Sequence, residues 1–405
     1  MVTGTCTKFW KESFDRGEKM TEVVTNTMEK GVIVIGGHVQ GLGIIRIFGR
    51  NGIRCYLLDS NSINIAKHSI YCSKFIEIDP EQEFTSFLIE LNSKYNLNGW
   101  LLIPTDDNYV RILSQNKQLL EKYFRVSVDD WQVIEKCYNK RITYRIVQDM
   151  GIDMPITYFP NNLEEIKTLN VDFPCIIKPA IMHKLNSQIH QKVLVCKNRE
   201  ELITNYEKVL HYISADEVII QEIIPGDSEN QYSACFFYNR TEPFVSLLAR
   251  RKRQYPMDFG KCTTFAETIF DESLLENAQL ILNKINFWGL CEVEFKKDER
   301  DGKYKFLEIN PRSWKWHSIA NKSVSPFLIS LYNFIYDGRP IFKNDWDKCC
   351  WKDLITDSFV TLILLTSFKF TTNKCQNIEF AVFDINDIKP LILEIIYSPY
   401  LFLSR

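Results

Sequence analysis

The sequence lacks the features that mark nucleic-acid-binding, membrane-spanning and secreted proteins. Its 49 Lys and Arg residues nearly balance 51 Asp and Glu, and the resulting net charge of −2 provides no basic surface for nucleic acid or anionic lipid. The longest apolar run, "SFVTLILLTSF" at 358–368, is too short to span a bilayer. Residues 1–30 contain no apolar stretch of signal-peptide length, and we expect them to form a loosely ordered extension. We therefore predict a cytoplasmic protein without a transmembrane segment or a nucleic-acid partner.

The cysteines form no C-x-x-C pair, although the chain has twelve of them. Most lie in apolar runs, such as "PCIIKP" at 174–179 and "SACFFY" at 233–238. This placement predicts buried, reduced thiols rather than a disulfide framework. With 27 Phe, 18 Tyr and 8 Trp, the 405-residue chain can form the large cores of two or three domains.

Strand-like and helix-like segments alternate from residue 32 onwards. The apolar run "VIVIGG" (32–37) ends in glycines, and a segment with helical periodicity follows at 41–52. A second strand ends in Asp59, and a later one, "GWLLIPTDD" (99–107), ends in two aspartates. This alternation predicts an α/β fold with a parallel, doubly wound sheet.

Two strand ends of this sheet allow more than one interpretation. The turn "GGHVQGLG" (36–43), with Asp59 as the acid on the second strand, resembles a dinucleotide-binding fingerprint. Its G-G-x-x-x-G spacing departs from G-x-G-x-x-G, so we favour glycines that permit a tight strand-to-helix turn. Asp106 and Asp107 could hold a substrate amino group or cap the end of a strand.

The middle of the chain places basic residues in or after apolar strands. Residues 130–150 are predicted to form one long helix that ends at Gly151. The buried strand "VDFPCIIKPA" (171–180) carries Lys178, which is costly to bury unless it binds an anion. The alternative is a lysine on an edge strand that reaches solvent. Four consecutive bases at 250–253 end another strand, and either form a solvated face or point partly into a site.

A predicted hairpin, "GLCEVEFKKDERDGKYKFLEINPR" (289–312), carries candidate metal ligands. On a regular strand, Glu308 and Asn310 share a face with Tyr304 and Phe306. If the loop has an odd number of residues centred on residue 301, Glu294 lies opposite Glu308. The carboxylates then repel each other unless a cation such as Mg²⁺ lies between them. With an even loop, the two glutamates lie on opposite faces and no metal site forms.

Together these segments resemble the ATP-grasp superfamily over about residues 31–340. The resemblance is closest to the carboxylate–amine ligase branch, which is similar to the halves of carbamoyl-phosphate synthase and biotin carboxylase and to D-aspartate ligases. It implies a Rossmann-like pre-ATP-grasp domain at 31–128, followed by an ATP-grasp domain at 129–342. Two α+β subdomains of the latter would sandwich the nucleotide, with a lid at about 165–225. Residues 343–405 would form a C-terminal helical extension.

The resemblance also implies roles for individual residues. ATP phosphates would be bound by Lys140 and Lys178, with Lys192 on the second lid strand. The adenine would lie against Gln221, Glu222, Ile223 and Ile224, and the ribose near Glu229, with Asp227 as the alternative. Mg²⁺, or Mn²⁺ in its place, would be bound by Glu294, Glu308 and Asn310. The catalytic groups would be Arg312 beside the transferring phosphate, and Lys252 and Arg253 facing phosphate and substrate.

The implied activity is an ATP-dependent ligase that joins a small carboxylate to an amine through an acyl phosphate, releasing ADP and phosphate. One alternative is a bicarbonate-activating carboxylase or carbamoyl-type enzyme, and another is a catalytically silent nucleotide-binding module. The chain shows no nucleophile motif and no A-M-K-M-like biotin attachment sequence. The lid loop "AIMHKLNSQIHQ" (180–191) departs from the family because it lacks glycine. The resemblance is compatible with a homodimer.

Overall fold

The first part of the chain folds into a five-stranded parallel sheet with the order β3-β2-β1-β4-β5. The computed structural model describes residues 30–181, 193–257, 262–366 and 375–403. The predicted doubly wound sheet is confirmed, and its first strand is entirely buried, as its apolar sequence requires. The elements of this part are β1 (Val32–Ile35), α1 (Val39–Arg50), β2 (Cys55–Asp59), η1 (Ala66–His68), β3 (Cys72–Glu77), α2 (Phe84–Tyr95), β4 (Leu101–Pro104), α3 (Asp107–Gln115), α4 (Lys117–Leu120) and β5 (Arg125–Val126).

The glycine turn after β1 is a close-packed corner. Gly36 has φ +109°, and a Cβ atom at this position would collide with the side chain of Thr105. The Gly37 N–H donates to the Asp59 carboxylate at 2.5 Å, and the Asn61 N–H donates to the same carboxylate at 2.8 Å. Asp59 therefore stabilises the turn. These contacts agree with the interpretation that the glycines permit a tight strand-to-helix turn.

The single helix predicted for residues 130–150 is wrong. The chain forms α5 (Trp131–Tyr138) and α6 (Lys140–Asp149), separated at Asn139 by a non-helical backbone with φ −96° and ψ 102°. The Asn139 side chain accepts a hydrogen bond from the Arg141 N–H at 3.1 Å and so caps the second helix. This break places Lys140 at the first position of α6.

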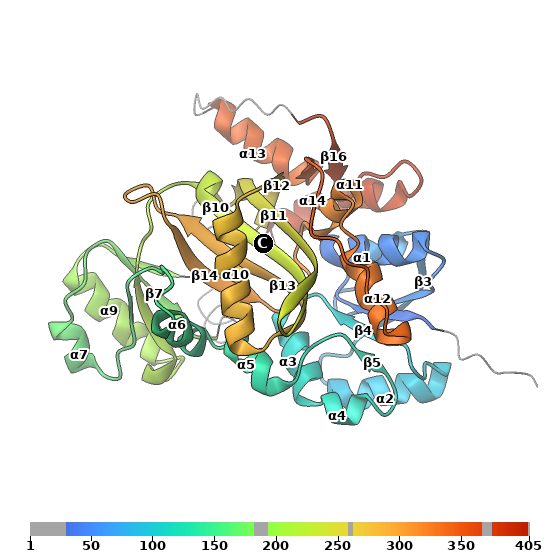
Figure 1. Cartoon of the computed structure of the whole chain (residues 1–405), viewed down its shortest axis with the longest axis horizontal. Coiled ribbons are helices and arrows are strands. Elements are labelled where there is room, and N and C mark those ends of the chain that lie inside the picture. The colour runs from blue at the N-terminus through green and yellow to red at the C-terminus, as the bar shows by residue number, and fades with distance from the viewer. Residues whose placement is uncertain (1–29, 182–192, 258–261, 367–374, 404–405) are drawn as a thin grey trace, which may run out of the picture.

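A small antiparallel sheet follows, with the order β6-β9-β7-β8. It has its own apolar core, formed with the helices that cover it. It lies at the left of Figure 1, away from the parallel sheet at the right. Its elements are β6 (Thr157–Tyr158), α7 (Leu163–Thr168), β7 (Cys175–Pro179), β8 (Leu194–Cys196), α9 (Arg199–Leu210), η2 (Ala215–Glu217) and β9 (Val218–Glu222).

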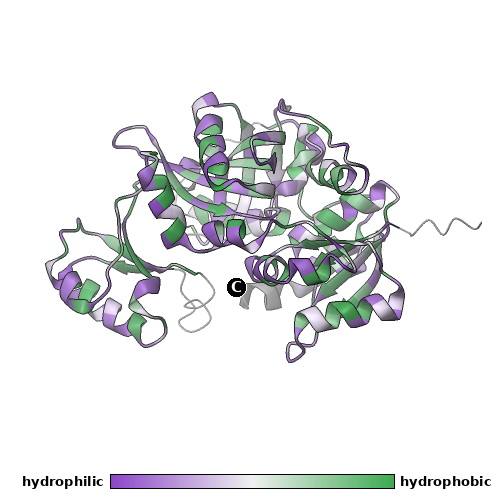
Figure 2. Cartoon of the chain, turned by 60° about the horizontal axis from the view of Figure 1, so that its bottom comes forward, coloured by the Kyte–Doolittle hydropathy of each residue, from purple (hydrophilic) through white to green (hydrophobic). Residues whose placement is uncertain are grey.

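A seven-stranded sheet with the order β14-β13-β10-β11-β12-β15-β16 occupies the centre of the molecule (Figure 1). Hydrophobic residues concentrate on the strands and on the helix faces that cover them, as Figure 2 shows. The elements are η3 (Ser228–Asn230), β10 (Gln231–Asn239), β11 (Glu242–Tyr255), β12 (Cys262–Ile269), α10 (Glu272–Ile285), β13 (Trp288–Lys297), β14 (Tyr304–Asn310), η4 (His317–Ile319), α11 (Ala320–Ser323), α12 (Phe327–Asp337), β15 (Cys350–Lys352), α13 (Leu354–Thr366), β16 (Ile378–Phe380) and α14 (Lys389–Leu403).

The C-terminal segment, expected to be a helical extension, also adds two strands to this central sheet. β15 pairs with β12, and β16 pairs with β15. Beyond β16, the carboxylate of Asp387 binds Arg46 of α1 at 2.9 Å and accepts from the Ser69 hydroxyl at 2.6 Å. The segment therefore ties the parallel sheet to the central one. The domain boundaries predicted at 128/129 and 342/343 stay predictions.

Two cysteines depart from the prediction of reduced thiols. Cys350 of β15 and Cys375, which precedes β16, form a disulfide, so the prediction is wrong for this pair. Free thiols at the other described positions are mostly buried, for example Cys235 and Cys291. The bridge arises from strand pairing between segments 25 residues apart in sequence, which no local pattern indicates. No helix in the described part of the chain is long and apolar enough to cross a membrane.

Candidate functional site at the junction of two sheets

The hairpin of β13 and β14 brings Glu294 opposite Glu308, and Glu292 opposite Asn310. A metal site on this hairpin requires Glu294 to lie opposite Glu308, and the structure shows this pairing. However, the loop between the two strands does not have the odd number of residues that was expected to produce it. Near the turn, Lys297 pairs with Tyr304, which leaves six residues between them. A β-bulge on β14 then shifts the register by one residue.

The bulge also changes which side chains share a face. Phe295 pairs with Phe306 and Glu294 with Glu308, so Leu307 is the extra residue. Phe306 is fully buried in the core against Phe295, with ring centroids 5.9 Å apart. The prediction that Phe306 lies on the face of Glu308 and Asn310 is therefore wrong. Leu307 lies beside Glu308 in the lining of a cavity instead.

Carboxylates gather closely on this face of the hairpin. The Asn310 side-chain NH₂ donates to Glu292 at 3.2 Å and to Glu294 at 3.0 Å. Burial and the nearby charge of Glu294 raise the pKa of Glu292 to about 8. The raised pKa reflects the negative charge of the neighbouring Glu294, and a cation that approached the cluster would offset that charge.

Two basic side chains partly offset this negative charge. Lys140, at the start of α6, forms an ion pair with Glu308, and Arg251 of β11 lies 3.5 Å from Glu294. Burial alone would lower the pKa of Lys140, but the Glu308 carboxylate raises the pKa above its usual value. The ion pair therefore favours the charged form of Lys140, which is the form that a lysine needs in order to bind phosphate.

Lys178 is buried in the interior of the small sheet, where its side chain is 8% exposed. Its strand β7 lies between β9 and β8, which excludes the alternative of an edge-strand lysine reaching solvent. The Lys178 ammonium group donates to the Tyr144 hydroxyl at 2.6 Å and to the side-chain amide oxygen of Gln221 at 2.7 Å. Two polar oxygens thus hold the ammonium group at the cavity that it lines.

A cavity of about 140 Å³ lies between the small sheet and the hairpin of the central sheet. Its lining combines basic groups and carboxylates with aliphatic side chains and two glutamines. This combination suits a ligand with a flat apolar ring and an anionic tail. The lining consists of Lys140, Pro155, Ile176, Lys178, Val193, Gln221, Glu222, Ile223, Ile224, Gln231, Arg251, Glu294, Lys296, Leu307 and Glu308.

The structure places the predicted adenine-binding residues at this cavity. Ile223 and Ile224 follow the end of β9 and line it. Gln221 uses its side-chain nitrogen to donate to the Thr157 hydroxyl at 2.7 Å. Glu222 accepts from the Ile156 N–H at 2.9 Å and binds Arg300 at 3.0 Å.

Sequence reasoning missed Arg251 and Lys296 as residues of the cavity. Lys296 donates to the Gly226 carbonyl at 2.7 Å, and burial lowers the pKa of its ammonium group. The signal for Lys296 was present, because alternation along β13 places it on the face of Glu294.

Arg251, rather than Arg253, lines the cavity because β11 also contains a bulge. Arg251 pairs with Ala266 and Arg253 with Phe265, so Lys252 is the extra residue. Arg253 consequently lies in the interior, with two of its nitrogens 2.7 and 2.6 Å from the Asp357 carboxylate of α13. The structure thus places Arg253 away from the site for which it was predicted.

The remaining predicted nucleotide residues lie elsewhere or outside the described chain. Lys252 forms an ion pair with Glu229 at 2.7 Å, and among the described residues neither lines the cavity. Asp227, the alternative ribose acid, caps η3 by accepting from the Glu229 N–H at 2.7 Å. Lys192 lies outside the described residues.

Arg312 links the hairpin to the carboxyl edge of the parallel sheet. Its Nε donates to the Asp107 carboxylate at 2.7 Å and a terminal nitrogen donates at 3.3 Å. Burial opposes its charge, but Asp107 raises the pKa of Arg312 further above its usual range. Asp106 accepts from the Tyr109 N–H at 3.0 Å, so it is the cap of α3. The capping alternative therefore holds for Asp106, and Asp107 orients Arg312.

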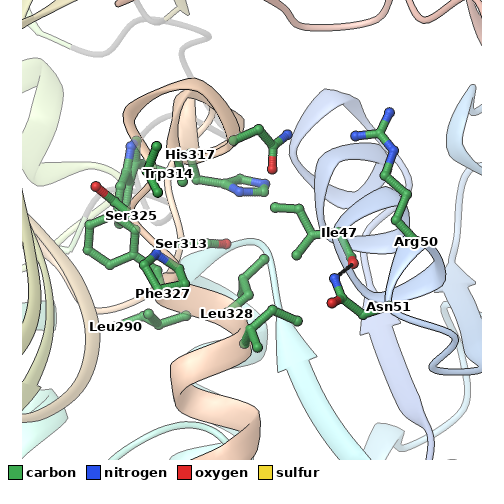
Figure 3. Close-up of a pocket in the computed structure, with 15 residues that line it drawn as sticks. Ile47, Arg50, Asn51, Leu290, Ser313, Trp314, His317, Ser325, Phe327 and Leu328 are labelled. Carbon is green, nitrogen blue, oxygen red and sulfur yellow. Dashed lines mark hydrogen bonds between the residues drawn. The ribbon is translucent and has the colours of Figure 1, made fainter. Parts of the chain in front are cut away.

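A larger cavity, of about 230 Å³, lies between α1 and the segment that leads into α12. Figure 3 shows Ile47, Arg50 and Asn51 on one side of it, facing His317 and Leu328 on the other. Its lining is mainly apolar and lacks the lysines and paired carboxylates of the smaller cavity, as far as the described residues show. The smaller cavity is therefore the candidate nucleotide site.

Comparison with known proteins agrees with this geometry. Residues 245–330, which include the hairpin, match the family model "Carbamoyl-phosphate synthase L chain, ATP binding domain". The chain is 26% identical over 299 residues to a D-aspartate ligase of Enterococcus faecium, covering 69% of this chain and 70% of that protein. Both matches support the predicted resemblance to ATP-grasp carboxylate–amine ligases. The predicted ligase class is likewise confirmed at the level of the family.

Solved structures confirm the ATP-grasp fold. The biotin carboxylase domain of Hydrogenobacter thermophilus 2-oxoglutarate carboxylase, a dimer in complex with MgADP, ADP and bicarbonate, matches with a TM-score of 0.64 at 14% identity, over 80% of this chain and 74% of that one. An N5-carboxyaminoimidazole ribonucleotide synthetase in its ADP complex matches with a TM-score of 0.61 at 14% identity, over 86% and 90%. An L-amino acid ligase from Bacillus licheniformis matches with a TM-score of 0.59 at 12% identity, over 76% and 74%.

Proposed function

We propose that this ATP-grasp protein is an ATP-dependent carboxylate–amine ligase that forms an amide bond through an acyl phosphate. The observation that carries the proposal is the meeting of Glu294 and Glu308, paired across the hairpin, with Lys140 and Lys178 at one cavity. Paired acids and lysines beside aliphatic side chains suit a nucleoside triphosphate and its metal. ATP is accordingly the expected nucleotide.

The residues at the cavity fit a hard divalent cation. In the described chain, no three His, Cys, Asp or Glu side chains are grouped so that they could hold a metal by themselves. Mg²⁺ commonly uses one or two carboxylates together with phosphate oxygens, and Glu294 and Glu308, with the amide oxygen of Asn310, can supply the protein share. Mg²⁺, or Mn²⁺ in its place, would supply charge neutralisation at the phosphates.

The main barrier to the proposed reaction is electrostatic repulsion between its two reactants. The carboxylate substrate and the terminal phosphate of ATP are both anions, so the attack needs positive charge around the phosphate. Lys140 provides it from the start of helix α6 and Lys178 from strand β7, and Arg251 adds a third cation at Glu294. The amine then displaces phosphate from the acyl phosphate, which requires no covalent enzyme intermediate.

The substrates would enter near the carboxyl edge of the parallel sheet. Arg312 and Asp107 meet there, close to the ends of β1 and β4, which is where the strand order changes direction. Open parallel sheets bind ligands at this kind of switch point. The D-aspartate ligase relative makes an amino acid the first substrate to test. A homodimer and a cytoplasmic location stay predictions.

The proposal is tested by measuring ADP release from Mg-ATP with pairs of amino acids and small carboxylic acids. Hydroxylamine, in place of the amine, should trap the acyl phosphate as a hydroxamate when the correct acid is present. Omission of the carboxylate is the matched control and should reduce turnover to background. AMP as the product would refute the acyl-phosphate route, ADP formed only with bicarbonate would replace the ligase by a carboxylase, and nucleotide binding without turnover would indicate a silent module.

A further inference from the structure

Three glutamates, Glu292, Glu294 and Glu308, lie on one face of the β13–β14 hairpin. The proposed reaction uses Glu294 and Glu308 but gives no role to Glu292. It is 4% exposed, compared with the partly exposed side chains of Glu294 and Glu308 on the same face. The described residues that line the nucleotide cavity do not include it. A carboxyl group buried beside the carboxylate of Glu294 is costly, so its presence needs a reason.

Both oxygens of Glu292 are engaged by protein groups. One accepts a hydrogen bond from the Ser233 hydroxyl of β10 at 2.9 Å, and the other accepts from the Asn310 side-chain NH₂ at 3.2 Å. Glu292 also lies directly opposite Asn310 in the β13–β14 register. Ser233 therefore holds the carboxyl group of Glu292 against the amide of Asn310.

The contacts of Asn310 show what this arrangement does. Its amide nitrogen has two hydrogens, and they are directed to Glu292 and Glu294. If the amide turned by 180°, its oxygen would face the acceptor oxygens of Glu292 and Glu294, and both hydrogen bonds from its nitrogen would be lost. The nitrogen is thus fixed toward the glutamates, and the amide oxygen faces the opposite way.

We propose that Glu292 is a positioning residue that turns the Asn310 amide oxygen toward the metal, without binding the metal itself. This inference rests on the proposed function, because it assumes a divalent cation at Glu294 and Glu308. Groups that orient a metal ligand typically change metal affinity by about 10-fold to 100-fold when they are removed.

The test measures Mn²⁺ affinity by electron paramagnetic resonance on the full chain with ADP bound. Glu292→Met removes the acceptor while keeping the length of the side chain, and we expect Mn²⁺ to bind at least about 10-fold more weakly. Glu292→Gln keeps an acceptor oxygen for Asn310 and a donor for Ser233 without the charge, and we expect affinity within about threefold of wild type. Ser233→Ala, a small change, should weaken binding several-fold because it releases the Glu292 carboxyl group.

The outcomes separate this inference from the proposed function. Absence of Mn²⁺ binding by the wild-type protein would refute the metal site and, with it, the proposed function. Wild-type affinity in Glu292→Met would overturn the positioning role alone. Equal weakening in the Gln and Met variants would also overturn it, because the charge of Glu292 would then act rather than its hydrogen bond. Thermal unfolding of each variant confirms that it is folded, and Ser233→Ala supplies the result if Glu292→Met does not fold.

Discussion

The buried ion pair of Arg253 with Asp357 predicts a large loss of stability when the arginine is replaced. Asp357 is 0% exposed and is bound by two nitrogens of Arg253, by the Thr264 hydroxyl at 3.0 Å and by Lys352 at 3.2 Å. Arg253→Met leaves the Asp357 carboxylate buried, with only Thr264 and Lys352 to stabilise its negative charge. Breaking a buried pair on one side costs about 3–5 kcal/mol, and because Lys352 and Thr264 remain we expect about 3 kcal/mol.

The same strand supplies a matched control. Arg250 forms an ion pair with Glu267, and their side chains are 31% and 29% exposed. Pairs in contact with water contribute less than about 1 kcal/mol, so Arg250→Met should have a small effect on stability. A double variant, Arg253→Met with Asp357→Leu, should recover much of the lost stability, since it leaves no uncompensated carboxylate.

The assay is urea-induced unfolding of each variant, followed by circular dichroism, together with ADP release below the unfolding transition. We expect Arg253→Met to be destabilised and, where folded, to keep most of its turnover, because Arg253 lies away from the cavity. A variant of wild-type stability that has lost turnover would refute this reasoning. It would restore the catalytic role that the sequence predicted for Arg253.

Three further predictions follow from the site and its surroundings. Glu308→Gln should lower ATP turnover at least about 100-fold with the circular dichroism spectrum retained, because an anionic metal ligand is lost; normal turnover with Mg²⁺ would contradict the metal assignment. Lys178→Ala should raise KM for ATP and lower kcat together, and unchanged steady-state kinetics would return Lys178 to a purely structural role. Burial lowers the pKa of His317 to about 4, so the folded state disfavours its protonation and stability should fall as pH drops from about 6.5 to about 4. His317→Gln should remove that part of the pH dependence in unfolding experiments, whereas parallel curves for the two proteins would contradict the assignment.

The sequence was sufficient to predict most of the elements around the site. Apolar runs and glycine stops correctly located β1, α1 and β2, since strands and helices impose different periods on hydrophobic residues. The same reasoning identified Lys178 as a buried lysine and placed Glu294 and Glu308 on one hairpin. These features depend on local spacing, which a single sequence contains.

Local spacing did not indicate the break at Asn139 or the bond between Cys350 and Cys375. The residues around Asn139 keep helical periodicity on both sides, and only the cap of α6 shows where one helix ends and the next begins. The disulfide depends on β15 and β16 meeting in the central sheet, with 25 residues of chain between the two cysteines. Neither feature has a periodic signal.

The residues that face the site were determined by β-bulges that only the tertiary structure shows. One extra residue, Leu307, brings Glu308 opposite Glu294 while Phe306 turns into the core. A second, Lys252, leaves Arg251 at the cavity and sends Arg253 to Asp357. Alternation within a strand follows from backbone geometry and can be predicted from sequence. A bulge depends on how the strand pairs with its neighbours and which side chains they can bury, and that balance is settled only when the whole sheet is assembled.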